Sequence, residues 1–322
     1  MFSVRTASSL TIPVLALVLG LAPDAPAQAA QSKVEKPAFQ RFATDPPALT
    51  QPTLVSTAWV AANAGKIVLI DARDKAEGYA AGHLPGARHV PTKTLRVESS
   101  GAPEELLPPE KLASVLGGLG IDADTPVVAY GEEKMADPAH VLLAMLTVGH
   151  TRVAVMEGGI QAWKAEKRAL STEAPAVGAK TYVPRASLVR AVRLDDVKRA
   201  SASGGPMILD VRPAEAFRGE GKSTEARPGH IPGSINRPAP LDLAAPEAGL
   251  YFVPLEKLAA DYAALGLKPS EPVILSCRTG HAAAQSYIAL KYLLGYEDVR
   301  WYDGSWQEWA AQAELPAAVG PK

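Results

Sequence analysis

Short apolar runs alternate with longer stretches at helical spacing from about residue 50 onward. The strand-like runs form three pairs, at residues 67–70 and 207–209, 127–130 and 273–275, and 153–156 and 299–302. Helical stretches lie between them, for example over residues 139–147 and 282–294. Short continuous apolar strands separated by helices are typical of a parallel sheet covered on both faces. The pattern therefore predicts an α/β fold built on mainly parallel sheets.

The pattern occurs twice. Matching residues recur 146 positions apart, as between Trp163 and Trp309 or between the Glu-Lys-Leu triplets at 110–112 and 256–258. Upstream, Asp-Ala-Arg at 71–73 matches Asp-Val-Arg at 210–212, and Gly-His-Leu-Pro-Gly at 82–86 matches Gly-His-Ile-Pro-Gly at 229–233. The second half also carries an eight-residue insertion around residues 219–227. A repeat of this length is a domain, so we predict domains at 49–172 and 188–316 joined by a linker at 173–187.

Composition and charge argue against several classes of partner and cofactor. The 322 residues are 47% hydrophobic and carry 33 basic against 34 acidic side chains, so bulk charge attracts neither nucleic acid nor an anionic membrane. The six histidines are scattered and have no cysteine partners at ligand spacing. We expect a monomer that needs no metal or organic cofactor.

The N-terminal residues have the pattern of an export signal. Arg5 precedes an apolar stretch at 10–21, and Ala27-Gln28-Ala29 forms a small-x-small cleavage site. An uncleaved membrane anchor is the alternative, but the stretch is short for a bilayer span. We predict a signal peptide over residues 1–29, a linker over 30–48, and a periplasmic or secreted protein that leaves the membrane after cleavage.

Cys277 is the only cysteine, so it cannot form an internal disulfide. It lies between the strand at 273–275 and the helix at 282–294, where backbone N–H groups and the helix dipole favour a thiolate. Arg278 adds a positive charge beside it. A lone cysteine can also be a small buried core residue, but this position favours a nucleophile.

These motifs together resemble the rhodanese superfamily, specifically its tandem-domain sulfurtransferases, over about residues 50–315. The resemblance is carried by the duplicated Asp-x-Arg and Gly-His-x-Pro-Gly blocks, by the blocks at 157–163 and 302–309, and by the loop Cys277-Arg278-Thr279-Gly280-His281-Ala282. It implies two rhodanese-like domains, of which only the second is catalytic, because Gly131 takes the position equivalent to Cys277. The first domain would then wall one side of the cleft.

The resemblance implies sulfur transfer by double displacement. Cys277 would take a sulfur atom from a small anionic donor as a persulfide, and cyanide or a thiol would then accept it. The amides of residues 278–282 would stabilise the persulfide anion. Arg278 beside Thr279 favours thiosulfate as the donor, and 3-mercaptopyruvate is the alternative.

Other predicted site residues depend on departures from the family pattern. Ala216 stands where the family has a substrate-binding arginine, and we expect Arg218 or Arg227 to replace it from an insertion over the cleft. Both could equally be ordinary surface arginines. His281 could either tune the Cys277 thiolate or cover the loop.

Three rival interpretations are weaker. A phosphatase of this ancestry needs an arginine six residues after the cysteine, where this chain has Ala283. A carrier or redox sensor that holds persulfide for a partner would use the same loop, and only turnover distinguishes it. A pure scaffold does not explain the cysteine. Residues that recur in both halves are predicted to be structural, as are the tryptophans that suit packing: His83, His230, Asp210, Arg212, Trp163, Trp306 and Trp309.

Overall fold

The computed structural model describes Met1 and residues 48–97, 104–220, 226–244 and 248–321. Residues 2–29 of the predicted signal peptide, residues 30–47 of the predicted linker, and residues 221–225 of the insertion lie outside these ranges. The described residues from 48 onward belong to one compact unit. Among the described helices, none is long and apolar enough to cross a bilayer.

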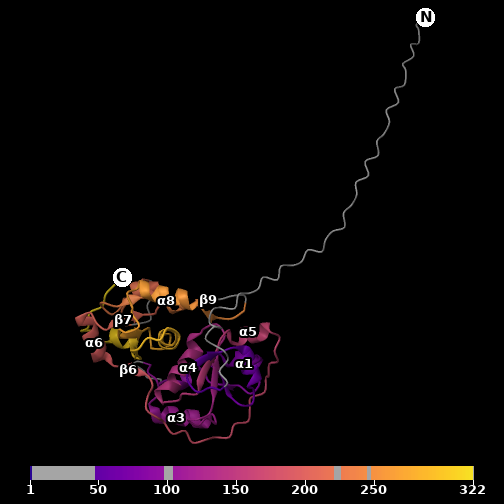
Figure 1. The fold of residues 1–322 in the computed structure, drawn as a ribbon. Helices are drawn as coiled ribbons and strands as arrows, with labels where there is room; N and C mark the ends of the chain where they lie inside the picture. The colour runs from indigo at the N-terminus through magenta and orange to yellow at the C-terminus, as the bar shows by residue number, and fades with distance from the viewer. Residues whose placement is uncertain (2–47, 98–103, 221–225, 245–247, 322) are drawn as a thin grey trace. The chain divides into compact units, whose positions relative to one another are not determined.

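The first half, drawn in indigo to magenta in Figure 1, contains a five-stranded sheet. Its strand order is β1-β5-β4-β2-β3, and every neighbouring pair is parallel. Its strands are β1 (Thr53–Val55), β2 (Val68–Asp71), β3 (Arg88–His89), β4 (Val127–Tyr130) and β5 (Val153–Met156). Its helices are α1 (Thr57–Ala62), α2 (Ala76–Ala81), the 3-10 helix η2 (Thr92–Leu95), α3 (Pro109–Gly118), α4 (Ala136–Thr147) and α5 (Gly159–Ala165).

The second half repeats this sheet in the order β6-β12-β11-β7-β8, again parallel throughout. Its strands are β6 (Arg190–Val192), β7 (Met207–Asp210), β8 (Ile235–Asn236), β11 (Val273–Ser276) and β12 (Val299–Tyr302). Its helices are α6 (Leu194–Ser203), α7 (Ala214–Arg218), the 3-10 helix η3 (Ala239–Asp242), α8 (Leu255–Ala264), α9 (Ala283–Tyr287), the π-helix η4 (Ile288–Leu293) and α10 (Ser305–Ala311). A short antiparallel pair, β9 (Leu243–Ala244) and β10 (Tyr251–Phe252), is added.

Strand register confirms the duplication. Asp71 pairs with Tyr130 in the first sheet, and Asp210 pairs with Ser276 in the second. Gly131 and Cys277 therefore follow equivalent strands at equivalent points. The predicted α/β fold of two tandem domains with parallel sheets is confirmed.

One hydrophobic core spans both halves. Side chains of α4 and α9 pack against each other, and a single cluster of buried residues extends from Leu54 to Trp301. The opposite faces of the two sheets have separate cores that contain Trp163 in the first half and Trp306 with Trp309 in the second. The predicted packing role of these tryptophans is confirmed.

The duplicated polar motifs are structural in both halves. Arg212 donates to both carboxylate oxygens of Asp210 and to the Gly229 carbonyl, just as Arg73 does to Asp71 and the Gly82 carbonyl. The imidazole of His230 stacks on Phe217 at 3.6 Å between ring centroids. His83 stacks on Tyr79 in the same way. These contacts fix the loops that follow β2 and β7.

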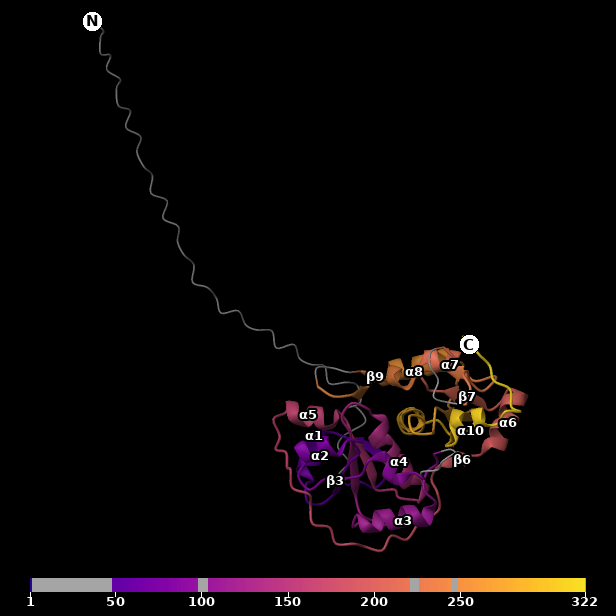
Figure 2. The same cartoon turned by 180° about the vertical axis from the view of Figure 1, so that it is seen from behind.

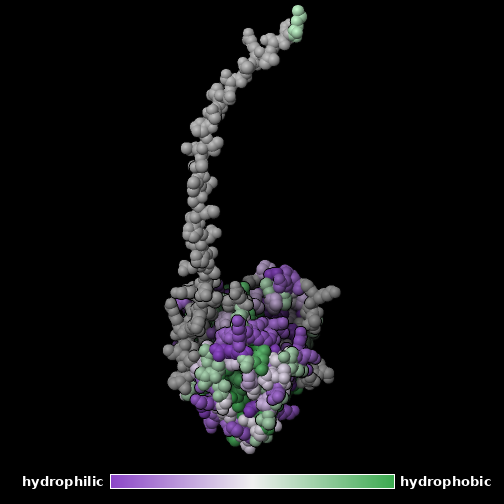
Figure 3. Space-filling view, turned by 90° about the vertical axis from the view of Figure 1, so that its right-hand side faces the viewer, coloured by the Kyte–Doolittle hydropathy of each residue, from purple (hydrophilic) through white to green (hydrophobic). Residues whose placement is uncertain are grey.

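The segment between the halves follows the first half along α3 (Figure 2). The amide of Lys180 donates to the Gly117 carbonyl at 2.9 Å, and that of Arg185 donates to Val148. On the face seen in Figure 3, hydrophilic residues gather across the middle and apolar residues form separate areas. Among the described residues from 48 onward, the exposed large apolar side chains are Leu170, Val177, Val183, Leu188, Leu241 and Val319.

Candidate active site

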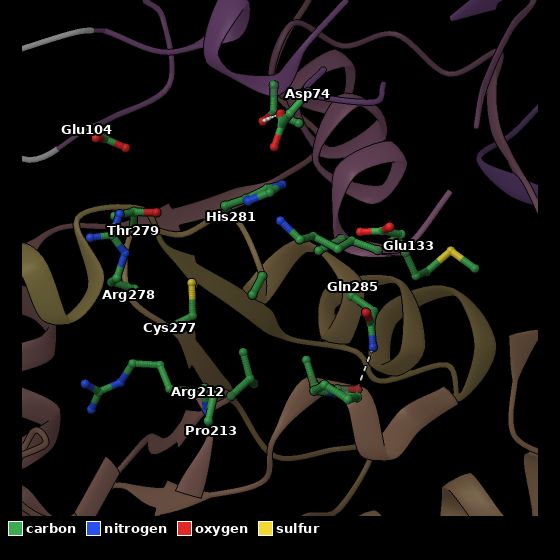
Figure 4. Close-up of a pocket in the computed structure, with 18 of the residues that line it drawn as sticks. Asp74, Glu104, Glu133, Arg212, Pro213, Cys277, Arg278, Thr279, His281 and Gln285 are labelled. Atoms are coloured by element: carbon green, nitrogen blue, oxygen red, sulfur yellow. Dashed lines mark hydrogen bonds between the residues drawn. The ribbon is translucent and has the colours of Figure 1, made fainter. Parts of the chain in front are cut away.

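Cys277 lies at the carboxyl end of β11, in the loop that leads to α9. It lines a cavity of about 1010 Å³ whose described walls come from both halves of the chain. Figure 4 shows its sulfur pointing into this space, with Arg278 and Arg212 on one side and Glu133 and Gln285 on the other. The residue is 1% exposed, so the cavity is its route to solvent.

Hydrogen bonds from donors outside the loop to its carbonyl groups hold the backbone of the Cys277 loop in place. The Cys277 carbonyl accepts from the Trp306 amide at 3.1 Å, and the Arg278 carbonyl accepts from the Gln307 amide at 3.0 Å. The Gly280 carbonyl accepts from the Trp301 indole at 2.9 Å. The fourth, that of Thr279, accepts from Arg96 at 2.5 Å. Four consecutive carbonyl oxygens are therefore engaged by donors outside the loop.

Two loop amides are fixed by one hydroxyl. Ser305 Oγ accepts from the amides of Cys277 and Gly280, each at 3.0 Å, and donates to the Tyr302 carbonyl. Within the described chain, the amides of Thr279, His281 and Ala282 have no acceptor. The prediction that all amides of residues 278–282 face the persulfide is therefore wrong for Gly280, while these three amides are available to an anion.

Arg96 connects the first half to this loop. Its side chain is 7% exposed, and Nη2 lies 3.5 Å from Asp303 Oδ1 as well as donating to Thr279. The other oxygen of Asp303 accepts from the Leu106 amide at 2.6 Å. Arg96 and Leu106 form an isolated antiparallel β-bridge with each other. This segment of the first half therefore supports the catalytic loop of the second half.

Replacing Arg96 with methionine is expected to lower kcat for sulfur transfer by about 10- to 100-fold, because the Thr279 carbonyl loses the donor that orients it. Arg96→Lys should not restore the rate, since a single ammonium group cannot reproduce the planar set of donors of a guanidinium. Steady-state kinetics of the two variants measure both effects. Arg185→Met is the matched control, because this arginine also pairs with an aspartate but is 49% exposed. Unchanged kcat in Arg96→Met would contradict the bracing role.

Two carboxyls, buried Glu157 and partly buried Asp303, should make stability fall as pH rises. Burial raises the pKa of Asp303 to about 7 and that of Glu157 to about 8, so the folded chain holds these protons more tightly than the unfolded chain. Stability is then lost as pH rises toward these values. Burial lowers the pKa of His140 and His150, so these two residues make stability rise with pH. Their effect is confined to pH values below about 6.5, the pKa of an unperturbed histidine.

Between pH 6.5 and 8, the free energy of unfolding is therefore expected to fall by about 2 kcal/mol, a change of several degrees in Tm. Calorimetry at several pH values measures it. Asp303→Asn and Glu157→Gln should each flatten the profile, whereas a slope that neither variant changes would contradict the assignment.

The equivalent position in the first half is closed. Gly131 replaces the cysteine, and the cavity beside it measures about 10 Å³. The Gly131 carbonyl accepts from Ile160, and Glu132 pairs with Arg73 and Lys164. Glu133 instead lines the cavity that contains Cys277. No nucleophile and no space for a substrate remain at this position in the described chain.

The predicted site residues divide into two groups. Arg278, Thr279, His281 and Ala282 line the cavity with Cys277, whereas Gly280 shapes the loop behind it. Arg227 instead donates to the carbonyls of Trp309, Ala310, Gln312 and Leu315 at the end of α10.

Arg218, at the end of α7, pairs with Glu220 at 2.8 Å. Neither Arg218 nor Arg227 is among the described residues that line the cavity, so the expectation that one of them replaces the arginine missing at Ala216 is corrected.

Several residues of the site were not predicted from the sequence. Ser305 was visible as a difference between the halves, because it stands where the first half has Gly159. Arg96 and Asp137 had no sequence signal, since their partners Thr279 and His281 lie more than a hundred residues away in another domain.

Comparison with known proteins supports the domain pattern. A family profile described as "Rhodanese-like domain" matches residues 55–166 and 193–312. A thiosulfate sulfurtransferase of Corynebacterium glutamicum is 31% identical over 88% of this chain and 94% of its own length. The sulfur carrier protein TtuD of Thermus thermophilus is 33% identical over 83% and 96%.

Among solved structures, the 3-mercaptopyruvate sulfotransferase SseA from Escherichia coli superimposes with a TM-score of 0.69 and 28% identity. The match covers 79% of this chain and 98% of SseA. Both domain matches fall on the two sheets described above, so the chain belongs to the rhodanese family as a tandem-domain member.

Proposed function

We propose that the protein is a sulfurtransferase that moves the outer sulfur of thiosulfate to cyanide or a thiol through a persulfide on Cys277. The observation that carries this proposal is the loop itself. The carbonyls of residues 277–280 are each bound by a donor, which leaves the Cys277 thiol and the amides of Thr279, His281 and Ala282 beside an open cavity. Such a loop suits a negatively charged sulfur species.

The first step forms one S–S bond and breaks another. The Cys277 thiolate attacks the outer sulfur of thiosulfate, and the bond between the two thiosulfate sulfurs breaks with its electron pair leaving on sulfite. Neither a proton nor an external oxidant is needed. The persulfide anion that remains on Cys277 is the form the loop amides would stabilise.

Charge in the cavity favours an anionic donor. Its described lining includes five lysine or arginine residues against three aspartate or glutamate residues. Arg278 follows the nucleophile directly and lies on the Cys277 side of the cavity (Figure 4). We assign Arg278 to the sulfonate end of thiosulfate, because a guanidinium binds oxyanions through paired donors.

Relatives favour the same chemistry and name its alternatives. The Corynebacterium relative is named a thiosulfate sulfurtransferase, whereas SseA is described as a 3-mercaptopyruvate sulfotransferase. The name of TtuD supports a second candidate, a persulfide carrier that delivers sulfur to a partner without turning over small molecules. We also propose export to the periplasm or the medium, on the basis of the apolar segment at 10–21 and its cleavage site.

Steady-state sulfur transfer to cyanide, measured with each donor in turn, tests this function. We expect kcat/KM for thiosulfate to exceed that for 3-mercaptopyruvate. The opposite preference would keep the fold and the cysteine chemistry but change the substrate. No turnover with either donor, from protein that is folded, would favour the carrier.

A further inference from the structure

His281 and Asp137 meet across the two halves of the chain. His281 lies in the catalytic loop, and Asp137 lies in the first turn of α4. The His281 Nε2 atom is 3.2 Å from Asp137 Oδ1, and the aspartate is 6% exposed. Both atoms are buried and neither has a hydrogen-bond partner in the described chain, so this ion-pair contact at 3.2 Å is the polar contact given for each of them.

We propose that His281 is the acid–base catalyst of the acceptor step, and that Asp137 is the residue that positions it. This inference rests on the proposed function and assigns residues to its second half-reaction, the transfer of sulfur from Cys277 to the acceptor. The acceptor it implies is a thiol that is protonated at neutral pH, because such an acceptor must lose a proton before its sulfur can attack.

The contact assigns the roles of the two ring nitrogens. A carboxylate oxygen offers only lone pairs, so we assign the ring proton to Nε2, which faces Asp137 Oδ1 at 3.2 Å, and the lone pair to Nδ1. The side chain is 24% exposed although Nε2 is buried, so the accessible part of the ring lies away from Asp137. His281 also lines the cavity that contains Cys277. Nδ1 is thus the nitrogen available to a molecule in that cavity.

The proposed step balances without a co-reactant. Nδ1 of His281 takes the proton of the acceptor thiol, and the resulting thiolate attacks the outer sulfur of the Cys277 persulfide. A new S–S bond forms in the acceptor, the bond to Cys277 breaks, and its electron pair stays on the Cys277 thiolate. The imidazolium then returns its proton to the persulfide product. Asp137 stabilises the positive ring during this interval.

The surroundings of His281 suit this role. His140, also on α4, meets the ring edge-on at 5.0 Å between centroids, and burial holds the pKa of His140 well below its usual range. Arg96 lies 3.4 Å from His140 Nε2 on the other side. Among the charged residues that line the cavity, Arg278 is nearest in sequence to His281, and Lys134 followed by Glu133 are nearest to Asp137. Because His140 stays neutral, Asp137 is the charged side chain in contact with the His281 ring among the described residues.

The first half-reaction provides the internal control. Attack of the Cys277 thiolate on thiosulfate moves no proton, so loss of the base should leave persulfide formation unchanged. Discharge to a protonated thiol should be slow without the base, whereas discharge to a thiol that is already ionised should not change. If either residue had a purely structural role, its replacement would slow persulfide formation and both discharge reactions alike.

The experiment loads wild type, Asp137→Asn and His281→Asn with thiosulfate, removes excess donor, and follows loss of the persulfide by intact mass. The two acceptors are 2-mercaptoethanol, which is mostly protonated at about pH 8, and 2,2,2-trifluoroethanethiol, which is of similar size and mostly ionised there. We expect all three proteins to reach one sulfur atom per chain when loading is allowed to go to completion, so that the discharge rates start from the same species. Discharge to 2-mercaptoethanol should be about 100-fold slower in both variants, and discharge to the fluorinated thiol should stay within a few-fold of wild type.

A pH series supplies the second measurement. The variant rates with 2-mercaptoethanol should rise with pH as that thiol ionises, while the wild-type rate changes less. Equal slowing with both thiols, or no slowing with either, would overturn the proposal. Failure of wild type to load sulfur would instead contradict the proposed function, so the two ideas fail separately.

Discussion

Cys277→Ser is expected to lower sulfur transfer from thiosulfate by at least about a thousandfold, to the uncatalysed background. Cys277 is the only cysteine in the chain, so no second thiol can form the persulfide. A serine hydroxyl lacks both the ionisation and the sulfur chemistry of the thiolate. Removing a covalent nucleophile has effects of this size or larger in other enzymes.

The same variant should remain folded, because the side chain at position 277 is nearly isosteric and its neighbours hold the loop through backbone groups. Tm within a few degrees of wild type is the control. Turnover that persists in the folded variant would mean that sulfur transfer in the assay does not pass through this cysteine.

Gly280→Ala should have the second largest effect. Gly280 has φ of +75°, and a Cβ atom there would lie 2.5 Å from Asp303 Oδ1 and 2.7 Å from the Asp303 carbonyl. The methyl group would therefore displace the loop from β12 and disturb the Ser305 and Trp301 contacts that fix it. A displacement of about 1 Å costs on the order of 100-fold in catalysis, so we expect kcat to fall by that factor or more.

Gly295→Ala separates this clash from backbone strain. Gly295 has a similar φ of +71°, but no heavy atom lies within 4 Å of a Cβ built there. It should cost about 1 kcal/mol of stability and leave kcat unchanged. If the two alanine variants have equal activity, the close packing of Gly280 on Asp303 does not matter for catalysis.

Local sequence patterns predicted most of the fold, because each strand and helix is coded by its own apolar spacing. The strand at 273–275, for example, appears as β11 over Val273–Ser276, and the duplicated blocks identified Gly131 as the partner of Cys277. The loop residues Arg278, Thr279, His281 and Ala282 could be found because they adjoin the nucleophile. Sequence proximity was a sufficient guide there.

Long-range contacts set the limit of that approach. Arg96 reaches Thr279 across 183 positions, and Asp137 meets His281 across a domain boundary, so neither pairing has a local pattern. For Arg227, in contrast, nearness in sequence to the site gave a wrong prediction. Its place in an insertion near the site suggested substrate binding, but four carbonyls at the end of α10 take its donors.

The most direct test of the account is the intact mass of the protein after brief exposure to thiosulfate without reductant. We expect the mass to rise by one sulfur atom, with release of one equivalent of sulfite, and peptide mapping to place that sulfur on Cys277. Added cyanide should remove it. A folded protein that gains no sulfur from thiosulfate or from 3-mercaptopyruvate would contradict the central claim that the Cys277 loop forms and holds a persulfide.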